Sequence, residues 1–481
     1  MKNLSEQKGT DRRRFLKYGA GVVVVAAAAA AGYYALQPAP GPPTPTTTTA
    51  ATTLPATPTT TAPPPPPAPV TINAYYPAHN NWLASDAVLN PFTQKTGIKV
   101  NAIVDSFFVI HDKLASTFAS GVYAYDACYA WGAWMSEFLE FFQPLDALGL
   151  EVPSDLKDDL IPWTRIAPTF KGRWYGLPNA FWVMLLHTNK KMFDEAGLEV
   201  PTSWDKFLET CEALKKKFGR DGVYPFAAGF QQGYLFPHYC AFLHGNGGSL
   251  WANDAKRTVT CDSKEAIAAV EDMITLYDNY MDPGAIEWIA GVQSGKAFYT
   301  EKAAMTLYYP WHSIVATKYY NLTTVAALWP GKKVRSGSGS AAEAMAIPKT
   351  AKYPKEAFEL MKYNASADID VGKPLAADDK YESTWPIRKS SYDDPRLANL
   401  VYPGFVKLVR EQASYRCTRY ERPAYQKIND IIEAEIVNAL KKVKTAEGAM
   451  KDAADLIKPI VDDEYAKYGG GYEDPWDTMP H

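Results

Sequence analysis

The stretch KGRWYGLPN, residues 171–179, together with LHTNKKMFDEAGLEVPTSWDKF, residues 186–207, decides the fold of this chain of 481 residues. The triplet Gly176-Leu177-Pro178 predicts a turn, because glycine and proline interrupt regular structure. The pair Thr202-Ser203 stands before Trp204-Asp205 and predicts a helix N-cap with an acidic first turn. We expect these residues to be structural, so the residues that contact a ligand must lie elsewhere in the chain.

Strands and helices are predicted to alternate upstream of this stretch. Strands are expected at residues 70–75, 97–104 and 125–129, and helices at residues 86–96 and 111–120. Such repetition predicts an α/β fold with a parallel sheet and helices on both faces. In open sheets of this kind the ligand lies beyond the carboxyl ends of the strands.

Aromatic and polar side chains are concentrated in the loops after these predicted strands. Tyr and Trp offer a flat apolar face and a hydrogen-bonding edge, which suits a polar ligand, but each residue is equally consistent with packing in the core. The candidates at these strand ends are Tyr75, Tyr76, His79, Asn80, Asn81, Trp82, Asp105, Trp131 and Trp134.

Further segments follow in an order that identifies a family resemblance. They are SGKAFYTEKAAM at 294–305 with Pro310-Trp311 after it, RSGSGS at 335–340 followed by MAIPK at 345–349, and WPIRKS at 385–390. With the opening stretch, they resemble the extracellular solute-binding proteins of ABC importers that are related to maltose-binding protein. The resemblance runs from about Val70 to Tyr465. One departure is His187-Thr188 before Asn189-Lys190, where the family usually has an aromatic residue.

The resemblance implies a two-lobed, periplasmic-binding-protein-like α/β fold with a central cleft. Three crossing strands form its hinge, and we place them near residues 179–183, 324–328 and 384–388. Lobe 1 is expected to comprise residues 70–180 plus 326–384, and lobe 2 residues 181–325 plus 385–475. The lobes of such a protein close around the ligand by hinge motion, and the transmembrane subunits of an ABC permease recognise the closed form.

The resemblance also implies a sugar ligand, mono- or oligosaccharide, and a set of residues that contact it. Trp182 falls at a crossover position that contacts sugar in the relatives, and Trp311 falls on a stacking tryptophan. Tyr234 and Phe236 lie near a second aromatic position. Sugar hydroxyl groups need donors and acceptors around the edge of the ring. The candidates for that polar rim are Asn81, Asp105, Asn179, Glu343 and Arg388, and Trp82 and Trp131 complete the set of expected ligand contacts. The family supplies no catalytic residue, metal or cofactor, so we expect a binding protein and not an enzyme.

The N-terminal region is predicted to be a targeting segment and a stalk. Residues 11–17, DRRRFLK, resemble the twin-arginine export motif, although a chance basic flank of an ordinary signal peptide is the alternative. The apolar run 18–36 is interpreted as a retained membrane anchor, so that residues 1–36 form a signal and anchor. Residues 37–69 are almost wholly Pro, Thr and Ala and predict an extended stalk. We therefore expect the body at the extracellular face of the cell membrane, as would suit an archaeal cell.

Composition excludes several classes of protein. The formal net charge is −3, with 50 basic and 53 acidic residues, and such a balance argues against a nucleic-acid partner. The five cysteines form no C-x-x-C pair, which argues against a zinc ribbon or a redox motif. The chain also carries no phosphate-binding loop, so it is not the ATPase subunit of an importer. The protein is expected to be a monomer.

Three alternatives to sugar binding remain open from the sequence. The pairs Tyr75-Tyr76, Tyr308-Tyr309 and Tyr319-Tyr320, with His312, are suitable ligands for ferric iron. A peptide or polyamine ligand would need a cluster of carboxylates in the cleft, and the sequence shows no obvious one. A carbohydrate-active enzyme would need two carboxylates that flank one glycosidic bond.

Overall fold

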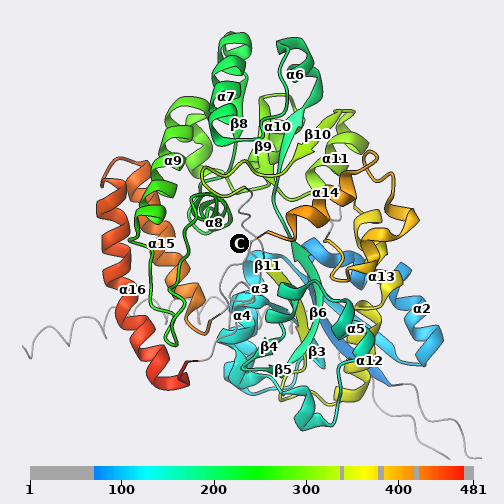
Figure 1. Ribbon diagram of the computed structural model, residues 1–481. Helices are drawn as coiled ribbons and strands as arrows, with labels where there is room; N and C mark the ends of the chain where they lie inside the picture. Colours follow the sequence, from blue (N-terminus) through cyan, green and yellow to red (C-terminus); the bar gives the residue numbers. More distant parts are fainter. Residues whose placement is uncertain (1–69, 336–340, 378–383, 416–421, 471–481) are drawn as a thin grey trace, which may run out of the picture. The chain divides into compact units, whose positions relative to one another are not determined.

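A computed structural model describes residues 70–335, 341–377, 384–415 and 422–470 (Figure 1). All of them belong to one compact unit, Pro67–His481. The predicted anchor, 1–36, and the predicted stalk, 37–69, lie outside the described residues. Among the helices of the described ranges, none has both the length and the apolar character needed to cross a membrane.

A five-stranded sheet forms one half of this unit, in the order β2-β1-β3-β11-β6. Its strands are β1 (Thr71–Pro77), β2 (Lys99–Asp105), β3 (Ala127–Trp131), β6 (Gly176–Trp182) and β11 (Ala341–Ala346). Strand β1 pairs in parallel with β2 and β3, whereas β11 pairs antiparallel with both β3 and β6. The three predicted strands therefore form parallel pairs, but the whole sheet is mixed because β11 returns from a distant part of the chain.

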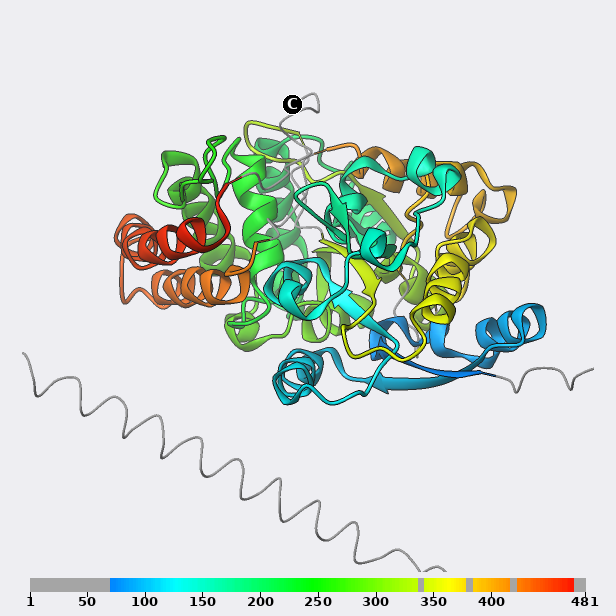
Figure 2. The same ribbon diagram turned by 90° about the horizontal axis from the view of Figure 1, so that it is seen from below.

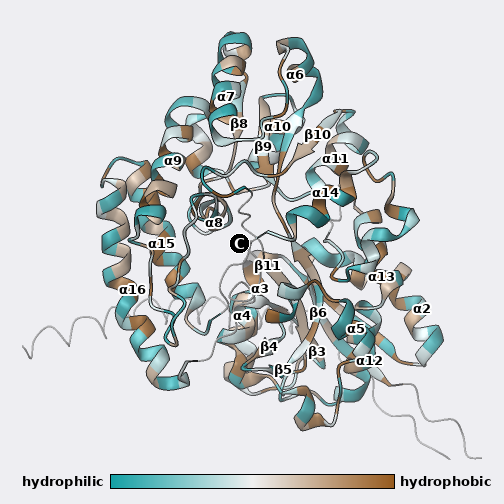
Figure 3. Ribbon diagram, in the orientation of Figure 1, coloured by the Kyte–Doolittle hydropathy of each residue, from teal (hydrophilic) through white to brown (hydrophobic). Residues whose placement is uncertain are grey.

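The helices around this sheet are α2 (Asp86–Thr96), α3 (Phe107–Ser120), α4 (Gly132–Glu137), α5 (Ser154–Asp159), α12 (Pro354–Asn364) and α13 (Ala367–Leu375). Helix α2 matches the predicted bounds, and α3 begins four residues before the predicted start at His111. The 3₁₀ segment η1 (Ala78–Ala84) connects β1 to α2. Hydrophobic residues are frequent in the strands, and hydrophilic residues are frequent along the outer helices (Figure 3).

A four-stranded sheet forms the other half, in the order β10-β7-β9-β8. Its strands are β7 (Leu185–Asn189), β8 (Tyr224–Ala227), β9 (Ala303–Tyr308) and β10 (Thr324–Ala327). Its helices are α6 (Lys190–Ala196), α7 (Trp204–Phe218), α8 (Phe236–Gly245), α9 (Lys264–Tyr280), α10 (Gln293–Tyr299) and α11 (Trp311–Tyr320). The N-cap predicted for α7 is confirmed, because the Ser203 side chain accepts a hydrogen bond from the backbone N–H of Lys206.

The turn predicted at Gly176-Leu177-Pro178 is wrong. These residues are the first part of β6, and the turn lies earlier, where Lys171 (φ 49°) and Gly172 (φ 75°) connect the short strands β4 (Thr169–Phe170) and β5 (Arg173–Trp174). Gly176 is required for the close pairing of β6 with β11, since a Cβ at this position would collide with the backbone carbonyl oxygen of Met345 on β11.

The chain passes between the two sheets over very short connections. Only Val183 and Met184 separate β6 of the five-stranded sheet from β7 of the four-stranded sheet. A segment from farther along the chain lies beside this connection, because Trp385 forms an antiparallel β-bridge to Phe181 in β6.

Three C-terminal helices complete the unit: α14 (Phe405–Gln412), α15 (Tyr425–Leu440) and α16 (Ala446–Tyr468). Helices α15 and α16 pack against each other and against α9, and they lie beside it in both views (Figures 1 and 2). Helix α15 also contacts α8 and, on the five-stranded side, α4. It therefore touches both halves of the unit.

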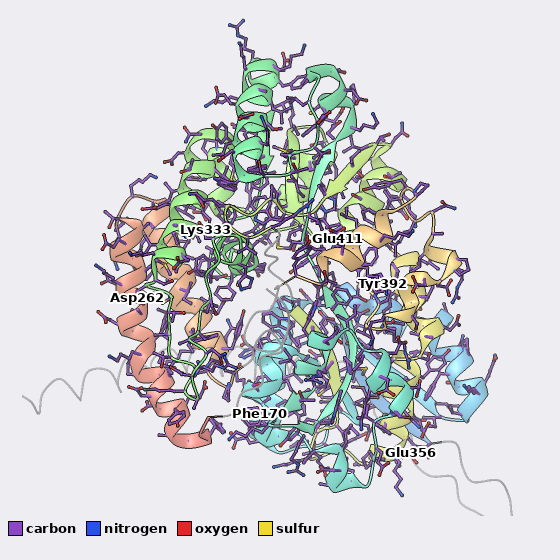
Figure 4. All side chains as sticks on the ribbon, viewed as in Figure 1. Phe170, Asp262, Lys333, Glu356, Tyr392 and Glu411 are labelled. Carbon is purple, nitrogen blue, oxygen red and sulfur yellow. The ribbon has the colours of Figure 1, made fainter. Side chains whose placement is uncertain are left out.

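The core takes up some of the aromatic residues that the sequence suggested for ligand binding. Tyr75 and Tyr76 on β1 are both 0 % exposed, where the sequence analysis had placed them in a loop beyond the strand. The reason is that β1 continues to Pro77, two residues beyond the predicted end of the strand. Side chains fill the space on both sides of the sheets (Figure 4).

Candidate functional site

A cavity of about 570 Å³ lies where the two halves meet, a volume within the usual range for small-molecule sites. Its lining residues come from β1–η1, α3, β3, α4, β6 and β11 on the five-stranded side. From the other half they come from the start of α8, the segment before α10, the end of β9, and α15. The aromatic and histidine residues among them are His79, Phe107, His111, Trp131, Trp134, Trp182, Tyr234, Phe236, Tyr308 and Tyr309.

The five-stranded side contributes a wall of packed aromatic rings. The Phe107 and Trp134 rings stack with centroids 5.0 Å apart and an interplanar angle of 17°. Trp131 meets both of them edge to face, at 5.7 and 5.3 Å. These contacts fix the ring orientations in the absence of a ligand, so the apolar faces on this wall are pre-organised.

The four-stranded side contributes tyrosines and Phe236. Tyr308 and Tyr309 lie at and just after the end of β9, at the edge of the cavity. The Tyr309 ring lies 4.9 Å from the ring of Trp182, so Trp182 connects the two aromatic walls. Phe236 packs edge to face on Tyr425 of α15 at 5.8 Å.

The polar centre of the cavity is the carboxylate of Glu343, which is 2 % exposed. Its Oε1 accepts hydrogen bonds from Trp182 Nε1 at 2.7 Å and Tyr129 OH at 3.0 Å, and it lies 2.9 Å from His79 Nε2. Its Oε2 is buried and has no hydrogen-bond partner among the described residues. Burial of a charged oxygen without a partner is costly, so this atom is suited to accept a hydrogen bond from a bound molecule.

Helix α15 supplies a polar face at spacings of three and four residues. Gln426, Asn429, Asp430 and Glu433 all line the cavity, because residues at these spacings share one side of a helix. Gln426 accepts a hydrogen bond from Trp134 Nε1 at 3.3 Å and donates one to Asp430 at 2.9 Å. The polar face of α15 is thus hydrogen-bonded to the aromatic wall of the five-stranded side.

Glu433 has a structural role at the same place. Its carboxylate is 0 % exposed and accepts hydrogen bonds from the backbone N–H groups of Gly233 and, at 2.8 Å, Phe236. Phe236 is the first residue of α8, so Glu433 satisfies donors at the N-terminus of that helix. This contact holds Tyr234 and Phe236 in the cavity wall.

Two histidines lie on the five-stranded side of the cavity. His79 bonds Glu343, and its ring meets Trp182 edge to face at 5.5 Å. His111 lies 3.1 Å from both carboxylate oxygens of Glu137. Partial burial alone would lower the pKa of His111, but the hydrogen bond and charge of Glu137 and of Asp112 outweigh it and raise that pKa above its ordinary value.

Gly291 is expected to control the position of a cavity tyrosine. It has φ +83°, and a Cβ there would collide with the ring of Tyr308, whose OH donates to the carbonyl of Ala290 at 3.0 Å. We expect Gly291→Ala to displace Tyr308, to lower the free energy of unfolding by about 1–3 kcal/mol, and to weaken ligand binding about fivefold. Chemical denaturation and calorimetric titration measure the two effects.

Gly197→Ala is the matched control for Gly291. Gly197 has φ +65° and open space where a Cβ would lie, so its substitution carries the backbone strain without a collision. Ligand affinity should be unchanged in this control. Equal affinities for both variants would contradict a role for the Tyr308 position in binding.

Five of the residues expected to contact ligand line this one cavity. They are Trp131, Trp182, Tyr234, Phe236 and Glu343. They come from β3, β6, the α8 start and β11, segments far apart in the sequence. Their contact with a ligand stays a prediction, but the structure brings them together.

Trp311, Trp82 and Asn81 are not among the lining residues. Trp311 is 7 % exposed at the start of α11 and packs in a small apolar cluster that also contains Trp182, with its Nε1 buried and unpartnered among the described residues. The Trp82 ring packs on Gly372 of α13, where a Cβ would collide with it. The Oδ1 atom of Asn81 on η1 is buried.

Asp105, Asn179 and Arg388 also lie outside the lining. Asp105 accepts hydrogen bonds from Lys113 at 2.7 Å and from Tyr75 at 2.9 Å. Asn179 is a buried residue of β6 at the register shift opposite Glu343 and Ala344. Arg388 donates to the carbonyl of Ala365 at 2.9 Å and to Asp155 at 3.1 Å, which ties together segments beneath the five-stranded sheet.

The polar face of α15 is the part of the site that sequence reasoning missed. The signal was present as four polar residues at i, i+3, i+4 and i+7 from Gln426 in an otherwise amphipathic helix. Such a pattern is typical of a solvent-facing surface, so it carries no sign of a cavity by itself. Phe107 was missed because α3 begins earlier than its predicted start, whereas His111 was predicted only as a residue of the helix.

The described residues contain no group of three or more His, Cys, Asp or Glu side chains arranged to hold a metal ion. Of the tyrosine pairs considered for iron, Tyr308 and Tyr309 line the cavity, while Tyr75 and Tyr76 are core residues. His312 is 0 % exposed behind Tyr308 and does not line the cavity. The cavity does contain carboxylates, from Asp112, Glu343, Asp430 and Glu433, which the sequence had not indicated as a cluster.

One curated relative gives a sequence match. The chain is 29 % identical over 245 residues to the "Multiple sugar-binding protein" of Streptococcus mutans serotype c. The match covers 46 % of this chain and 56 % of that protein, so this chain spans little more than half the length of the curated relative.

Solved structures share the fold along most of the described chain. A maltose-bound T. maritima MalE3 superposes with a TM-score of 0.71 at 22 % identity, covering 81 % of this chain and 100 % of that one. An ABC transporter solute-binding protein from Thermotoga lettingae, bound with α-D-tagatose, gives a TM-score of 0.70 at 23 % identity over 82 % of this chain and 100 % of that one. The predicted two-lobed fold is thereby confirmed.

The family described as "Bacterial extracellular solute-binding protein" matches residues 83–370, well over half of the chain. This match includes β2, β3, β6 to β11 and the helices between them. The chain belongs to the bacterial extracellular solute-binding proteins.

Proposed function

We propose that this protein is the substrate-binding component of an ABC importer and that it captures a saccharide in the cavity between its lobes. The single observation that carries the proposal is the combination of aromatic walls with a buried carboxylate at one place. Sugar rings pack their C–H faces on aromatic side chains, and their hydroxyl groups need acceptors such as Glu343 Oε2. The sugar-binding relative in S. mutans supports this class of ligand.

The lobe boundaries in this proposal are those that the family resemblance implies. Residues 70–180 plus 326–384 form lobe 1, and residues 181–325 plus 385–475 form lobe 2, with hinge strands near 179–183, 324–328 and 384–388. Because the cavity takes side chains from both sheets, a ligand bound there contacts both lobes and favours the closed arrangement by its differential affinity. The closed form is what permease subunits would recognise.

The protein acts as a carrier and not as an enzyme under this proposal. The matched relatives are binding proteins. Of the cavity carboxylates, Glu433 is engaged with backbone N–H groups at the start of α8, which leaves it unsuited to proton transfer at a sugar bond. The monomeric state, the twin-arginine route and the membrane anchor at 18–36 belong to the same proposal and rest on the sequence.

A thermal-shift panel tests the class of ligand. A cognate saccharide at about 100 times its dissociation constant should stabilise the protein by about 2.7 kcal/mol and raise its melting temperature. The panel should contain mono- and oligosaccharides, ferric citrate, a peptide mixture and a polyamine. Stabilisation by ferric citrate or peptides, with none by any saccharide, would contradict the proposal.

Small-angle scattering of the fragment 70–481 tests closure. The radius of gyration should fall when the stabilising saccharide is added, because two lobes swing together about the hinge strands. An unchanged profile at saturating ligand would contradict the hinge mechanism, although not the binding itself.

A further inference from the structure

Apart from His79 and His111, the cavity wall carries charge of one sign. Its lining includes the carboxylates of Asp112, Glu343, Asp430 and Glu433, and no lysine or arginine of the described ranges lines it. A cavity lined in this way repels anions and attracts cations, since a site of one sign with low-dielectric walls focuses the field. Sugar acids and sugar phosphates are therefore disfavoured in this cavity.

Two of the four carboxylates are already engaged. Glu433 accepts the backbone N–H groups of Gly233 and Phe236. Asp112 has a side chain that is 93 % exposed and lies 3.3 Å from His111, so solvent screens its charge. The remaining pair, Glu343 and Asp430, has acceptor capacity left for a ligand.

Glu343 is the unusual member of this pair. Its side chain is 3 % exposed, and Oε1 receives all of its hydrogen bonds while Oε2 has no partner in the described residues. The buried cation Lys373 has Asp370 as its own counter-charge, at 2.8 Å. The charge of Glu343 also acts on Lys373, and His79 lies 2.9 Å from Oε1, so positive groups are already close to this carboxylate. The partner that Oε2 itself lacks is a hydrogen-bond donor.

Other groups contribute less to a preference for a cation. Trp182 donates its N–H to Glu343 at 2.7 Å, so the carboxylate lies at the edge of the indole ring and not over its face. On α15, Asp430 lines the cavity and accepts a hydrogen bond from the amide of Gln426, but it is exposed, so solvent screens its charge as it does that of Asp112.

We infer that the cognate saccharide carries an ammonium group, as amino sugars do, and that this group donates a hydrogen bond to Oε2 of Glu343. The inference rests on the proposed saccharide-binding function and names the substrate class for that same site. The ammonium supplies the donor that Oε2 lacks, its charge suits the acidic lining of the cavity, and the aromatic walls hold the ring that bears it. A neutral hydroxyl supplies the donor alone.

The test compares sugars that differ at one substituent. One series consists of glucose, glucosamine, N-acetylglucosamine and glucuronate. A second compares cellobiose with its di-glucosamine counterpart. Galactose and galactosamine test whether the preference depends on ring stereochemistry. In calorimetric titrations at pH 6.5, the amine form of each sugar should bind at least about tenfold more tightly than its hydroxyl form. This ratio corresponds to about 1.4 kcal/mol of binding free energy. Glucuronate should bind most weakly, and added salt should reduce the preference for the amine.

Substitution of Glu343 tests the assigned atom. Glu343→Gln keeps an acceptor for Trp182 and Tyr129 but replaces Oε2 with an amide nitrogen, which cannot accept a hydrogen bond. The ratio of amine to hydroxyl affinity should fall to about one, and use of the ratio removes any general loss of binding. Glu356→Gln is the matched control, because it changes net charge equally on α12, at the lower end of Figure 4 and outside the cavity lining. The ratio of amine to hydroxyl affinity in Glu356→Gln should equal that of the unaltered protein.

The outcomes separate this inference from the proposed function. Binding of neutral sugars as tightly as, or more tightly than, their amine forms overturns the inference and leaves saccharide binding intact. An unchanged ratio in Glu343→Gln overturns the assignment to Oε2. Binding of spermidine with no binding by any saccharide overturns both, as does a complete absence of saccharide binding. The affinity ratio of the unaltered protein decides the ligand class even if Glu343→Gln does not fold.

Discussion

Lowering the pH from about 7 to about 4 is expected to remove about 3 kcal/mol of stability through His187 alone. His187 lies on β7 and is 0 % exposed, and burial lowers its pKa from 6.5 to about 4, although backbone hydrogen bonds from the Tyr308–Tyr309 segment partly oppose this. The unfolded chain takes up a proton below about pH 6.5, whereas the folded protein does so only below about pH 4. The stability is therefore fully present above pH 6.5 and is lost as the pH falls through this window.

A second buried histidine adds to the same effect. The pKa of His312 lies well below its ordinary value, because it is buried first of all and because His187 and His238 are close. Both ring nitrogens of His312 are buried without hydrogen-bond partners among the described residues. Its protonation inside the fold would leave a buried, uncompensated charge. The two histidines together should make the second lobe acid-labile.

Chemical denaturation at a series of pH values between 8 and 4 measures this loss. His187→Gln should flatten the pH dependence relative to the unaltered protein, even though its stability at pH 8 is lower. His111→Gln is a control of opposite sign: its raised pKa contributes stability below pH 6.5 that is lost as the pH rises, so its removal should steepen the acid loss. Parallel pH profiles for the unaltered protein and His187→Gln would contradict the assignment.

Replacing Trp182 with alanine is expected to weaken saccharide binding by about 5- to 150-fold, or about 1–3 kcal/mol. Trp182 lines the cavity, contacts Tyr309 of the other wall and donates to Glu343, so its loss removes a ring surface and disturbs the carboxylate. Trp182→Phe separates the two contributions, because it keeps an aromatic face and removes the N–H. Titration of both variants, with thermal melts in the absence of ligand, gives the measurement.

Trp311→Ala is the comparison that locates the stacking position. The family resemblance predicts that Trp311 stacks on a sugar ring, whereas the structure places it 7 % exposed behind the lining residues. A loss of affinity in Trp311→Ala equal to that in Trp182→Ala, with unliganded stability retained, would support stacking at Trp311. A large fall in melting temperature with affinity retained would assign Trp311 to the core.

Local sequence signals predicted much of the fold because they depend on neighbouring residues. Ser203 was recognisable as an N-cap, and helix α2 as an amphipathic segment, because capping and periodicity act within one or two turns. The antiparallel strand β11 was different. Its place between β3 and β6 depends on a connection of more than 150 residues from β6, which no local pattern encodes. The mixed character of the first sheet was therefore missed.

The site was predicted least well where a side chain's direction decides its role. Tyr75 is the last residue of one predicted strand and Trp131 follows another by two residues, but Tyr75 faces the core and Trp131 lines the cavity. Arg388 was a candidate for the polar rim, but its guanidinium is bonded to Ala365 and Asp155 instead. A strand alternates its faces with every residue, so an error of one residue in its register reverses such an assignment.

The position of α15 has a consequence for the lining of the cavity. Four of its residues line the cavity, and Glu433 holds the start of α8, yet the family match ends at residue 370, before this helix begins. The matched range carries β2 to β11 and the aromatic walls, while β1, His79 and the polar face of α15 lie outside it. Changes on the polar face of this single helix would therefore alter the lining of the cavity and leave both sheets as they are.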